Sequence, residues 1–108
     1  MNKLILEREK DLLEASGEYV VTSKTLQEAE IKYNLLKAKI MNMETVATLS
    51  NQSMRDAQVD VYLNTREDFK PIYDTYLDAK LAQKKAWIDW TVALEFVKNG
   101  RILVMNEQ

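Results

Sequence analysis

Three lysines in the middle of the chain have the clearest capacity for chemistry. Lys32, Lys37 and Lys39 fall within residues 32–43, a window that contains no carboxylate in a chain whose net charge is −2. Ammonium groups grouped in this way bind a phosphate backbone weakly and without sequence preference, and an assembly that repeats them raises the affinity. The same cluster is also typical of a solvated face near a helix C-terminus, where the helix dipole favours cations. The residues alone leave both interpretations open.

Catalytic chemistry has few candidates because the chain contains neither histidine nor cysteine. Their absence removes imidazole and thiol catalysis, disulfides and Cys/His metal sites together. Asp74 and Asp78 share a helix face at four-residue spacing, but such pairs are common on helix surfaces. We therefore predict no catalytic residues, no metal site and no cofactor, and a protein that is not an enzyme.

Aromatic residues could stack on nucleic-acid bases, as they do in proteins that bind single strands. Here they recur at heptad spacing, which favours core packing. The residues in question are Tyr19, Tyr33, Phe69, Tyr76 and Trp90. Tyr33 remains a candidate for a supporting contact because it lies next to Lys32 in the sequence.

A seven-residue repeat runs through the first half of the chain. Its first column is Ile5, Leu12, Tyr19, Leu26, Tyr33, Ile40 and Ala47. The column three residues later runs from Arg8 to Met43 and is small in its middle, at Ala15, Thr22 and Ala29. Such a repeat is typical of a coiled coil. It predicts one long helix over residues 1–48, which Gly17 does not interrupt.

The rest of the chain is expected to fold back on this helix. Residues 49–53 form the predicted turn, and Ser53 with Asp56 predicts the N-terminal cap of a short helix over residues 54–68. Pro71 must lie in a first turn or at a kink, so we expect a break between Tyr62 and Lys70. The repeat resumes at Phe69 and predicts a second long helix over residues 69–99, which ends at Asn99 and Gly100 before an apolar tail at 100–108.

These elements predict a single all-α domain over residues 1–108, built as a long helical hairpin with coiled-coil heptads and an oligomerising C-terminal helix. The apolar stripe of the second long helix is wider than a two-helix seam needs. Its surplus predicts a homo-oligomer. The predicted interface comprises Trp87, Trp90, Leu94, Val97, Ile102 and Val104. No apolar run is long enough for a signal peptide or a membrane span, so we expect a cytoplasmic protein with no membrane partner.

Two segments resemble UvsY-like recombination mediators of tailed phages. Leu36-Lys37-Ala38-Lys39-Ile40, preceded by Glu28-Ala29, is similar to an element late in that family's N-terminal helical region. Residues 93–102 are similar to its C-terminal run. The resemblance implies a ring-forming protein in the cytoplasm of a bacterial host, which binds single-stranded DNA and helps a recombinase replace the single-stranded-DNA-binding protein. It assigns the DNA contact to Lys37 and Lys39, where the family has a basic pair.

Two functions from different classes follow. The first is a recombination accessory protein that binds single-stranded DNA non-specifically as a homo-oligomer, through Lys37 and Lys39 with Lys32 and Tyr33 in support. The alternative is a non-enzymatic module for protein–protein interaction, such as a phage adaptor or a host-defence inhibitor, which acts through its helical surfaces.

Overall fold

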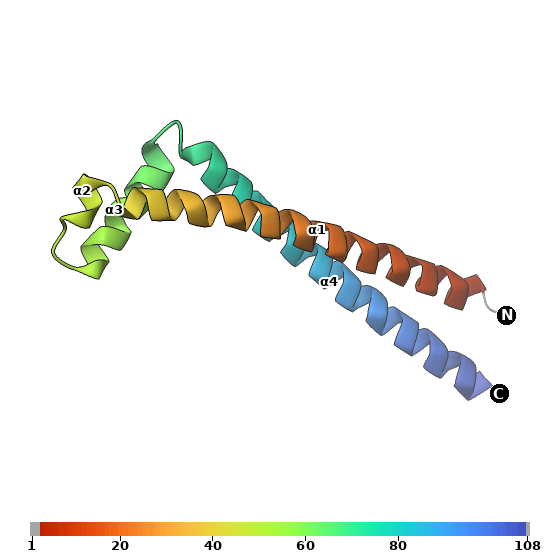
Figure 1. The fold of residues 1–108 in the computed structure, drawn as a ribbon. Helices are drawn as coiled ribbons and strands as arrows, with labels where there is room; N and C mark the ends of the chain where they lie inside the picture. Colours follow the sequence, from red (N-terminus) through yellow and green to blue (C-terminus); the bar gives the residue numbers. More distant parts are fainter. Residues whose placement is uncertain (1–2, 108) are drawn as a thin grey trace. The chain divides into compact units, whose positions relative to one another are not determined.

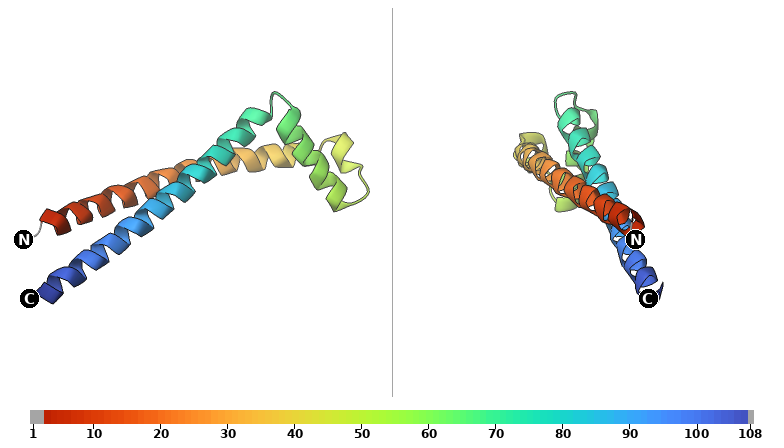
Figure 2. Two further views of the ribbon diagram at one scale, coloured as in Figure 1. Left: turned by 180° about the vertical axis from the view of Figure 1, so that it is seen from behind. Right: turned by 90° about the vertical axis from the view of Figure 1, so that its right-hand side faces the viewer.

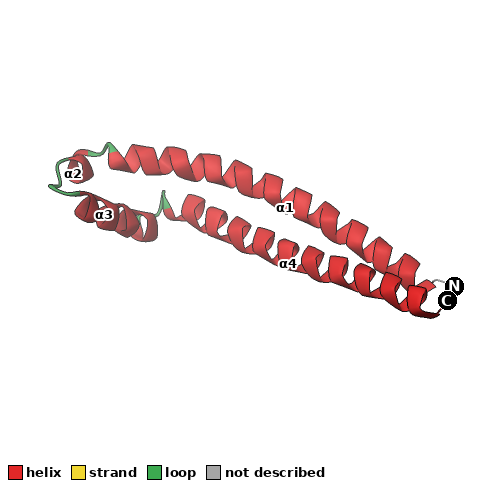
Figure 3. Ribbon diagram, turned by 90° about the horizontal axis from the view of Figure 1, so that it is seen from below, coloured by secondary structure: helices red, strands yellow, loops and turns green. Residues whose placement is uncertain are grey.

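The computed structural model describes residues 3–107, with side chains described as far as Gly100. Four helices follow one another: α1 (Lys3–Met41), α2 (Glu44–Ala47), α3 (Gln52–Thr65) and α4 (Lys70–Glu107). Only helices and loops occur in this part of the chain (Figure 3). The long helix α1 packs against the long helix α4, which confirms the predicted all-α helical hairpin (Figure 1).

The contacts divide the chain into two compact units. Unit 1 consists of Met1–Lys24 and Leu81–Gln108, and unit 2 consists of Thr25–Lys80. In each unit a part of α1 and a part of α4 run in opposite directions (Figure 2). Unit 2 also contains α2 and α3.

The heptad positions predicted from the sequence are the ones that the two long helices bury. On α1 they are buried or half-buried from Ile5 to Ile40, and on α4 from Ile72 to Val97, with Phe69 buried in the turn just before α4. Thr22 is a polar member of this set, and its hydroxyl donates to the backbone carbonyls of Glu18 and Tyr19 at 2.9 and 3.1 Å. Its polar group is therefore satisfied inside the helix.

Unit 1 combines an aromatic stack with an arginine contact. The Tyr19 and Trp90 rings stack with their centroids 5.4 Å apart. Nearer the N-terminus, Nη1 of Arg8 donates to the carbonyl of Phe96 at 2.8 Å, and the Arg8 guanidinium lies 5.7 Å from the centre of the Phe96 ring. A Cβ on Gly100 would lie 3.0 Å from Arg8 Nη1, so the lack of a side chain there makes room for the arginine.

Unit 2 has a compact apolar cluster. The buried side chains come from α1, α2, α3 and the turn before α4, and they are Leu36, Ile40, Val46, Val59, Leu63 and Phe69. Tyr33, Met41, Met43, Tyr62, Ile72 and Tyr73 pack around them. The two short helices thus cover the apolar side chains at the turn of the hairpin.

The first helix ends at Met41, so the prediction of a helix through residue 48 is wrong in its last turns. Met43 is extended, with φ −67° and ψ 139°, and the chain restarts as α2. This break turns Val46 into the cluster, where it is fully buried, while Ala47 of the predicted repeat is exposed. Burial of the larger side chain accounts for the interruption.

The middle helix starts and ends earlier than predicted. It spans Gln52–Thr65, and its N-terminal cap is Asn51, whose side-chain oxygen accepts from the Met54 backbone N–H at 2.9 Å. The predicted cap, Ser53, lies inside the helix. The expected break between Tyr62 and Lys70 is confirmed, because Arg66 is extended and Pro71 stands in the first turn of α4.

The second long helix does not end at Gly100. It continues to Glu107, so the predicted tail at 100–108 is helical as far as it is described. A glycine that ends a helix usually adopts a positive φ, and Gly100 does not. The lack of a side chain at Gly100 instead leaves room for the Arg8 side chain.

Candidate functional site

The three predicted lysines lie on the part of α1 that belongs to unit 2, and all are exposed. None of them forms an ion pair in the described part of the chain, where the ion pair found joins Arg66 to Asp68 at 2.8 Å. Their charges are therefore available to an anionic partner in this arrangement.

Lys39 lies close to the apolar cluster of unit 2. Its ammonium nitrogen is 6.0 Å from the centre of the buried Phe69 ring, and Cζ of Arg66 lies 4.1 Å from the same centre. Cation–π contacts of this kind stabilise by about 0.5–1 kcal/mol at exposed sites. Lys39 thus has a packing contact in addition to its charge.

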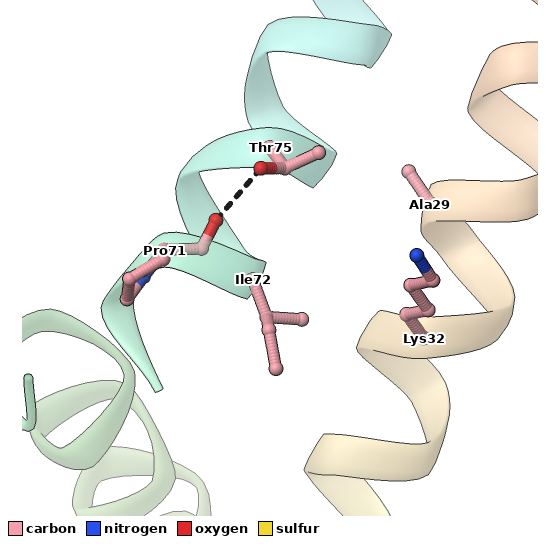
Figure 4. A pocket seen from close by; sticks show the side chains of 5 residues that line it. All are labelled: Ala29, Lys32, Pro71, Ile72 and Thr75. Atoms are coloured by element: carbon pink, nitrogen blue, oxygen red, sulfur yellow. Dashed lines mark hydrogen bonds between the residues drawn. The ribbon is translucent and has the colours of Figure 1, made fainter. Parts of the chain in front are cut away.

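Lys32 borders a small pocket between α1 and α4 of unit 2. The pocket has a volume of about 180 Å³, and it is lined by Ala29, Lys32, Pro71, Ile72 and Thr75 (Figure 4). The Thr75 hydroxyl already donates to the Pro71 carbonyl at 2.8 Å. A ligand pocket normally offers several convergent polar groups, whereas Ala29, Pro71 and Ile72 make the lining of this one mostly apolar. The pocket therefore offers too few polar groups for a typical small-molecule site.

Tyr33 belongs to an aromatic stack. Its ring lies 4.2 Å from that of Tyr76 with an angle of 5° between the planes, and 5.8 Å from that of Tyr73. Burial raises the pKa of the Tyr33 hydroxyl, and the nearby Tyr73, Tyr76 and Asp60 raise it further. One face of the ring is covered by Tyr76, so Tyr33 holds the two helices together. Its contact with a nucleic-acid base stays a prediction.

The structure brings two of the three lysines to one flank of the helix pair. Lys32 and Lys39 are seven residues apart, and they face Ile72 of α4 and Phe69 in the turn before α4 respectively. By its heptad position Lys37 lies on the opposite flank, as does Lys80, whose ammonium is 5.3 Å from the centre of the Tyr76 ring. One chain therefore presents two small basic patches instead of one.

The predicted oligomer residues occupy different environments in unit 1. Trp87 is 49% exposed and Leu94 is half-buried beside a groove, so both remain accessible. Trp90 stacks on Tyr19. Val97 is only 3% exposed, because it already packs within the chain's own helix pair, so it has little surface for a second subunit. Ile102 and Val104 lie outside the residues whose side chains are described.

Sequence reasoning missed an apolar column on α1. Leu6, Leu13 and Val20 follow one another at seven-residue spacing and are 66%, 73% and 65% exposed. They stand one position after Ile5, Leu12 and Tyr19, and their own seven-residue recurrence was the available signal. Leu13 and Leu94 line the same groove, together with Glu9, Leu12, Ser16 and Trp90. We call the surface formed by Leu6, Leu13, Val20, Trp87 and Leu94 the Leu13 face.

The other side of unit 1 is acidic. Two grooves lie there, one lined by Asp11, Asp89 and Phe96 among others, and one by Glu18, Lys85 and Asp89 among others. Glu7 and Glu14 stand four residues before and three residues after Asp11, so they share its side of α1. We call this surface, with Glu7, Asp11, Glu14, Glu18 and Asp89, the acidic face.

Within the described residues no group of three or more carboxylates is arranged to hold a metal ion. No helix in that part of the chain combines the length and the apolar composition needed to cross a lipid bilayer. Comparison of the chain with models of protein families, with curated proteins and with solved structures gives no match in any of the three. The relation to UvsY-like mediators therefore stays a prediction from two short segments.

Proposed function

We propose that this chain is a non-enzymatic interaction module that works as an assembly of identical chains. The observation that carries the proposal is the exposed apolar column Leu6, Leu13 and Val20, together with Trp87, on one side of unit 1. Removing a large apolar side chain from water stabilises by about 1.5–3 kcal/mol. A contiguous row of such side chains is typical of a protein–protein contact surface.

The acidic face fits the same proposal. An assembly that covers the Leu13 face leaves five carboxylates turned outward, where they are suited to a basic surface of another protein. This is the form that an adaptor or a host-defence inhibitor would take. Charge complementarity of this kind speeds association and excludes wrong partners.

Sedimentation velocity from low to high micromolar concentration tests the proposal. We expect a sedimentation coefficient that increases with concentration toward that of a defined oligomer. A monomer at every concentration contradicts the proposal, because the apolar column would then stay exposed to water instead of being buried between identical chains.

Single-strand DNA binding is the second candidate. The observation that favours it is that Lys32, Lys37 and Lys39 are exposed and form no ion pair with the side chains that the structure describes. An oligomer would repeat the two basic patches of each chain and bind a phosphate backbone by avidity. Together with the resemblance described above, this would make the protein a recombination accessory that works with a recombinase and a single-stranded-DNA-binding protein.

Fluorescence anisotropy of a labelled single-stranded oligonucleotide over a salt series separates the two candidates. For DNA binding we expect the log–log slope against salt to be about −0.7 per neutralised phosphate. The double variant Lys37→Ala/Lys39→Ala should flatten this slope, whereas the matched variant Lys10→Ala/Lys24→Ala, on α1 of unit 1, should leave it unchanged. If an intact oligomer does not bind the oligonucleotide at low salt, the protein-interaction module remains as the only one of the two candidates.

A further inference from the structure

We infer that a second copy of this chain packs on the Leu13 face of unit 1, with α1 of each copy lying antiparallel across α4 of the other. The inference rests on the proposed function and specifies its contact surface. It follows from four features of unit 1: the position of its apolar side chains, its charges, its size and the level at which its two helices pair.

One side of unit 1 carries a continuous apolar surface. Leu6, Leu13 and Val20 supply it from α1, and Trp87 and Leu94, seven residues apart, supply it from α4. The other exposed large apolar side chains of unit 1 lie elsewhere, and they are Leu4, Val21, Leu81, Ile88, Val92 and Phe96. The groove that Leu13 and Leu94 share joins the two helices on this side. Between the large side chains stands Ser16, which is small enough to let a neighbouring helix approach closely. The surface therefore has ridges and a groove, as helix packing requires.

Charge separates the Leu13 face from the acidic face. Around the Leu13 face stand Glu9 in the groove and Lys84 and Lys98, three residues before Trp87 and four residues after Leu94. The acidic face carries five carboxylates against the single ammonium of Lys85. Two copies joined through the acidic face would bring like charges within the Debye length of about 8 Å. Two copies joined through the Leu13 face avoid that repulsion.

The surface is large enough for a stable contact. The 22 residues of α1 from position 3 to position 24 span about 33 Å, and two helices side by side are about 20 Å wide, which gives roughly 650 Å² for each copy. Specific interfaces bury about 600–1,000 Å² on each partner, so this surface reaches the lower part of that range. The apolar centre and charged edge also match the usual anatomy of an interface.

The pairing level of the two helices fixes the register. Because Tyr19 of α1 stacks on Trp90 of α4, these two residues lie at the same height along the helix pair. The two helices are antiparallel, so Leu94 lies level with position 15 of α1, and Trp87 lies level with position 22 of α1. A two-fold axis parallel to the helices leaves each residue of the second copy at the same height along the helix axis as in the first. It also sets α1 of one copy against α4 of the other. Leu13 then meets Leu94 of the second copy, and Val20 meets its Trp87, each offset by about two residues or 3 Å.

The other two-fold arrangement, with the axis across the helices, places α4 on α4. If Trp87 is paired with Leu94 of the second copy there, Leu13 lies level with that copy's Lys24, and Val20 lies level with its Gly17. The arrangement of α1 on α4, in which Leu13 and Val20 both meet large apolar side chains, is therefore favoured.

Two adjacent valines provide a matched test. Val20 belongs to the Leu13 face and Val21 turns away from it, and their side chains are similarly exposed, at 65% and 58%. Val20→Glu places a carboxylate in the contact, and we expect the dissociation constant from sedimentation equilibrium to rise by about tenfold or more. Val21→Glu should leave it within about twofold, and circular dichroism of both variants checks that the helices are retained. Equal effects of the two substitutions overturn the inference.

Cysteine cross-linking tests the register, because the natural chain has no cysteine. We expect Leu13→Cys chains mixed with size-tagged Leu94→Cys chains to give mainly the mixed disulfide dimer on a non-reducing gel. A mixture of Val21→Cys and Val92→Cys chains is the control and should give none. Leu13–Leu13 dimers in excess of the mixed dimer contradict the proposed register.

The outcomes also distinguish this inference from the proposed function. A wild-type chain that sediments as a monomer contradicts both. A wild-type oligomer that Val20→Glu does not weaken contradicts only the choice of face, and the interaction module remains.

Discussion

Replacing each of the two glycines by alanine measures the contact of Arg8 with α4. Both glycines lie inside long helices, where alanine is favoured over glycine by about 0.5–1 kcal/mol. A Cβ at Gly17 would meet nothing within 4 Å, so Gly17→Ala should deliver this full gain in the free energy of unfolding. For a domain of this size 1 kcal/mol raises the midpoint of thermal unfolding by about 4 °C.

Gly100→Ala has the same gain in helix preference but meets Arg8. The new Cβ would stand 3.0 Å from Nη1 and 3.3 Å from Cδ of the arginine, which is tighter than ordinary van der Waals contact. The guanidinium must shift, which weakens its 2.8 Å hydrogen bond to the Phe96 carbonyl. Such a bond contributes about 1 kcal/mol. The two effects cancel, so we expect Gly100→Ala to change the free energy of unfolding by less than about 0.5 kcal/mol.

Urea unfolding followed by circular dichroism at a fixed protein concentration provides the assay, since stability of an oligomer depends on concentration. In an Arg8→Ala background the obstacle is gone, and Gly100→Ala should then gain as much as Gly17→Ala does. If Gly100→Ala already gains the full amount in the wild-type chain, Arg8 does not restrict this position and the reasoning is refuted.

Further predictions concern the cap of α3 and the aromatic stack. Asn51→Ala removes the acceptor of the Met54 N–H and should lower the free energy of unfolding by about 1 kcal/mol in urea titrations. Ser53→Ala, inside the same helix, should change it by less than about 0.5 kcal/mol, and a larger loss there than at Asn51 would contradict the cap assignment. Burial raises the pKa of Tyr33 in the folded state above the unfolded value near 10, so its contribution to stability is full below that pH and is lost as the pH rises through the folded pKa. Tyr33→Phe should therefore reduce the loss of stability in alkaline urea titrations, and an unchanged pH profile would show that Tyr33 ionises as in the unfolded chain.

The heptad repeat by itself determined which side chains the two long helices bury. The predicted columns are followed without a slip from Ile5 to Ile40 on α1, and from Phe69, just before α4, to Val97 on α4. The physical reason is local, because the period of a helix places every seventh residue on the same side whatever packs against it. Pro71 likewise fixed the start of α4 through its missing N–H.

The tertiary structure decided where the helices end. Nothing local in the sequence marks Met41 as a last residue, and α1 stops there because Val46 gains burial against Ile40 and Leu63 from other helices. Conversely, Asn99 and Gly100 look like a helix end, yet α4 continues past them. Arg8, 92 residues away in the sequence, occupies the space that Gly100 leaves. Such contacts between distant residues have no signature in a local pattern.

The candidate sites divide in the same way. The positive window at 32–43 is visible in the sequence, but only the packing shows that Tyr33 lies under Tyr76 and that Lys39 stands over Phe69. On α4 the surplus apolar surface was predicted, whereas the exposure of Leu6, Leu13 and Val20 required the arrangement of both helices. Periodicity places residues on one side of a helix, and only the neighbouring helix determines how much of that side remains in water.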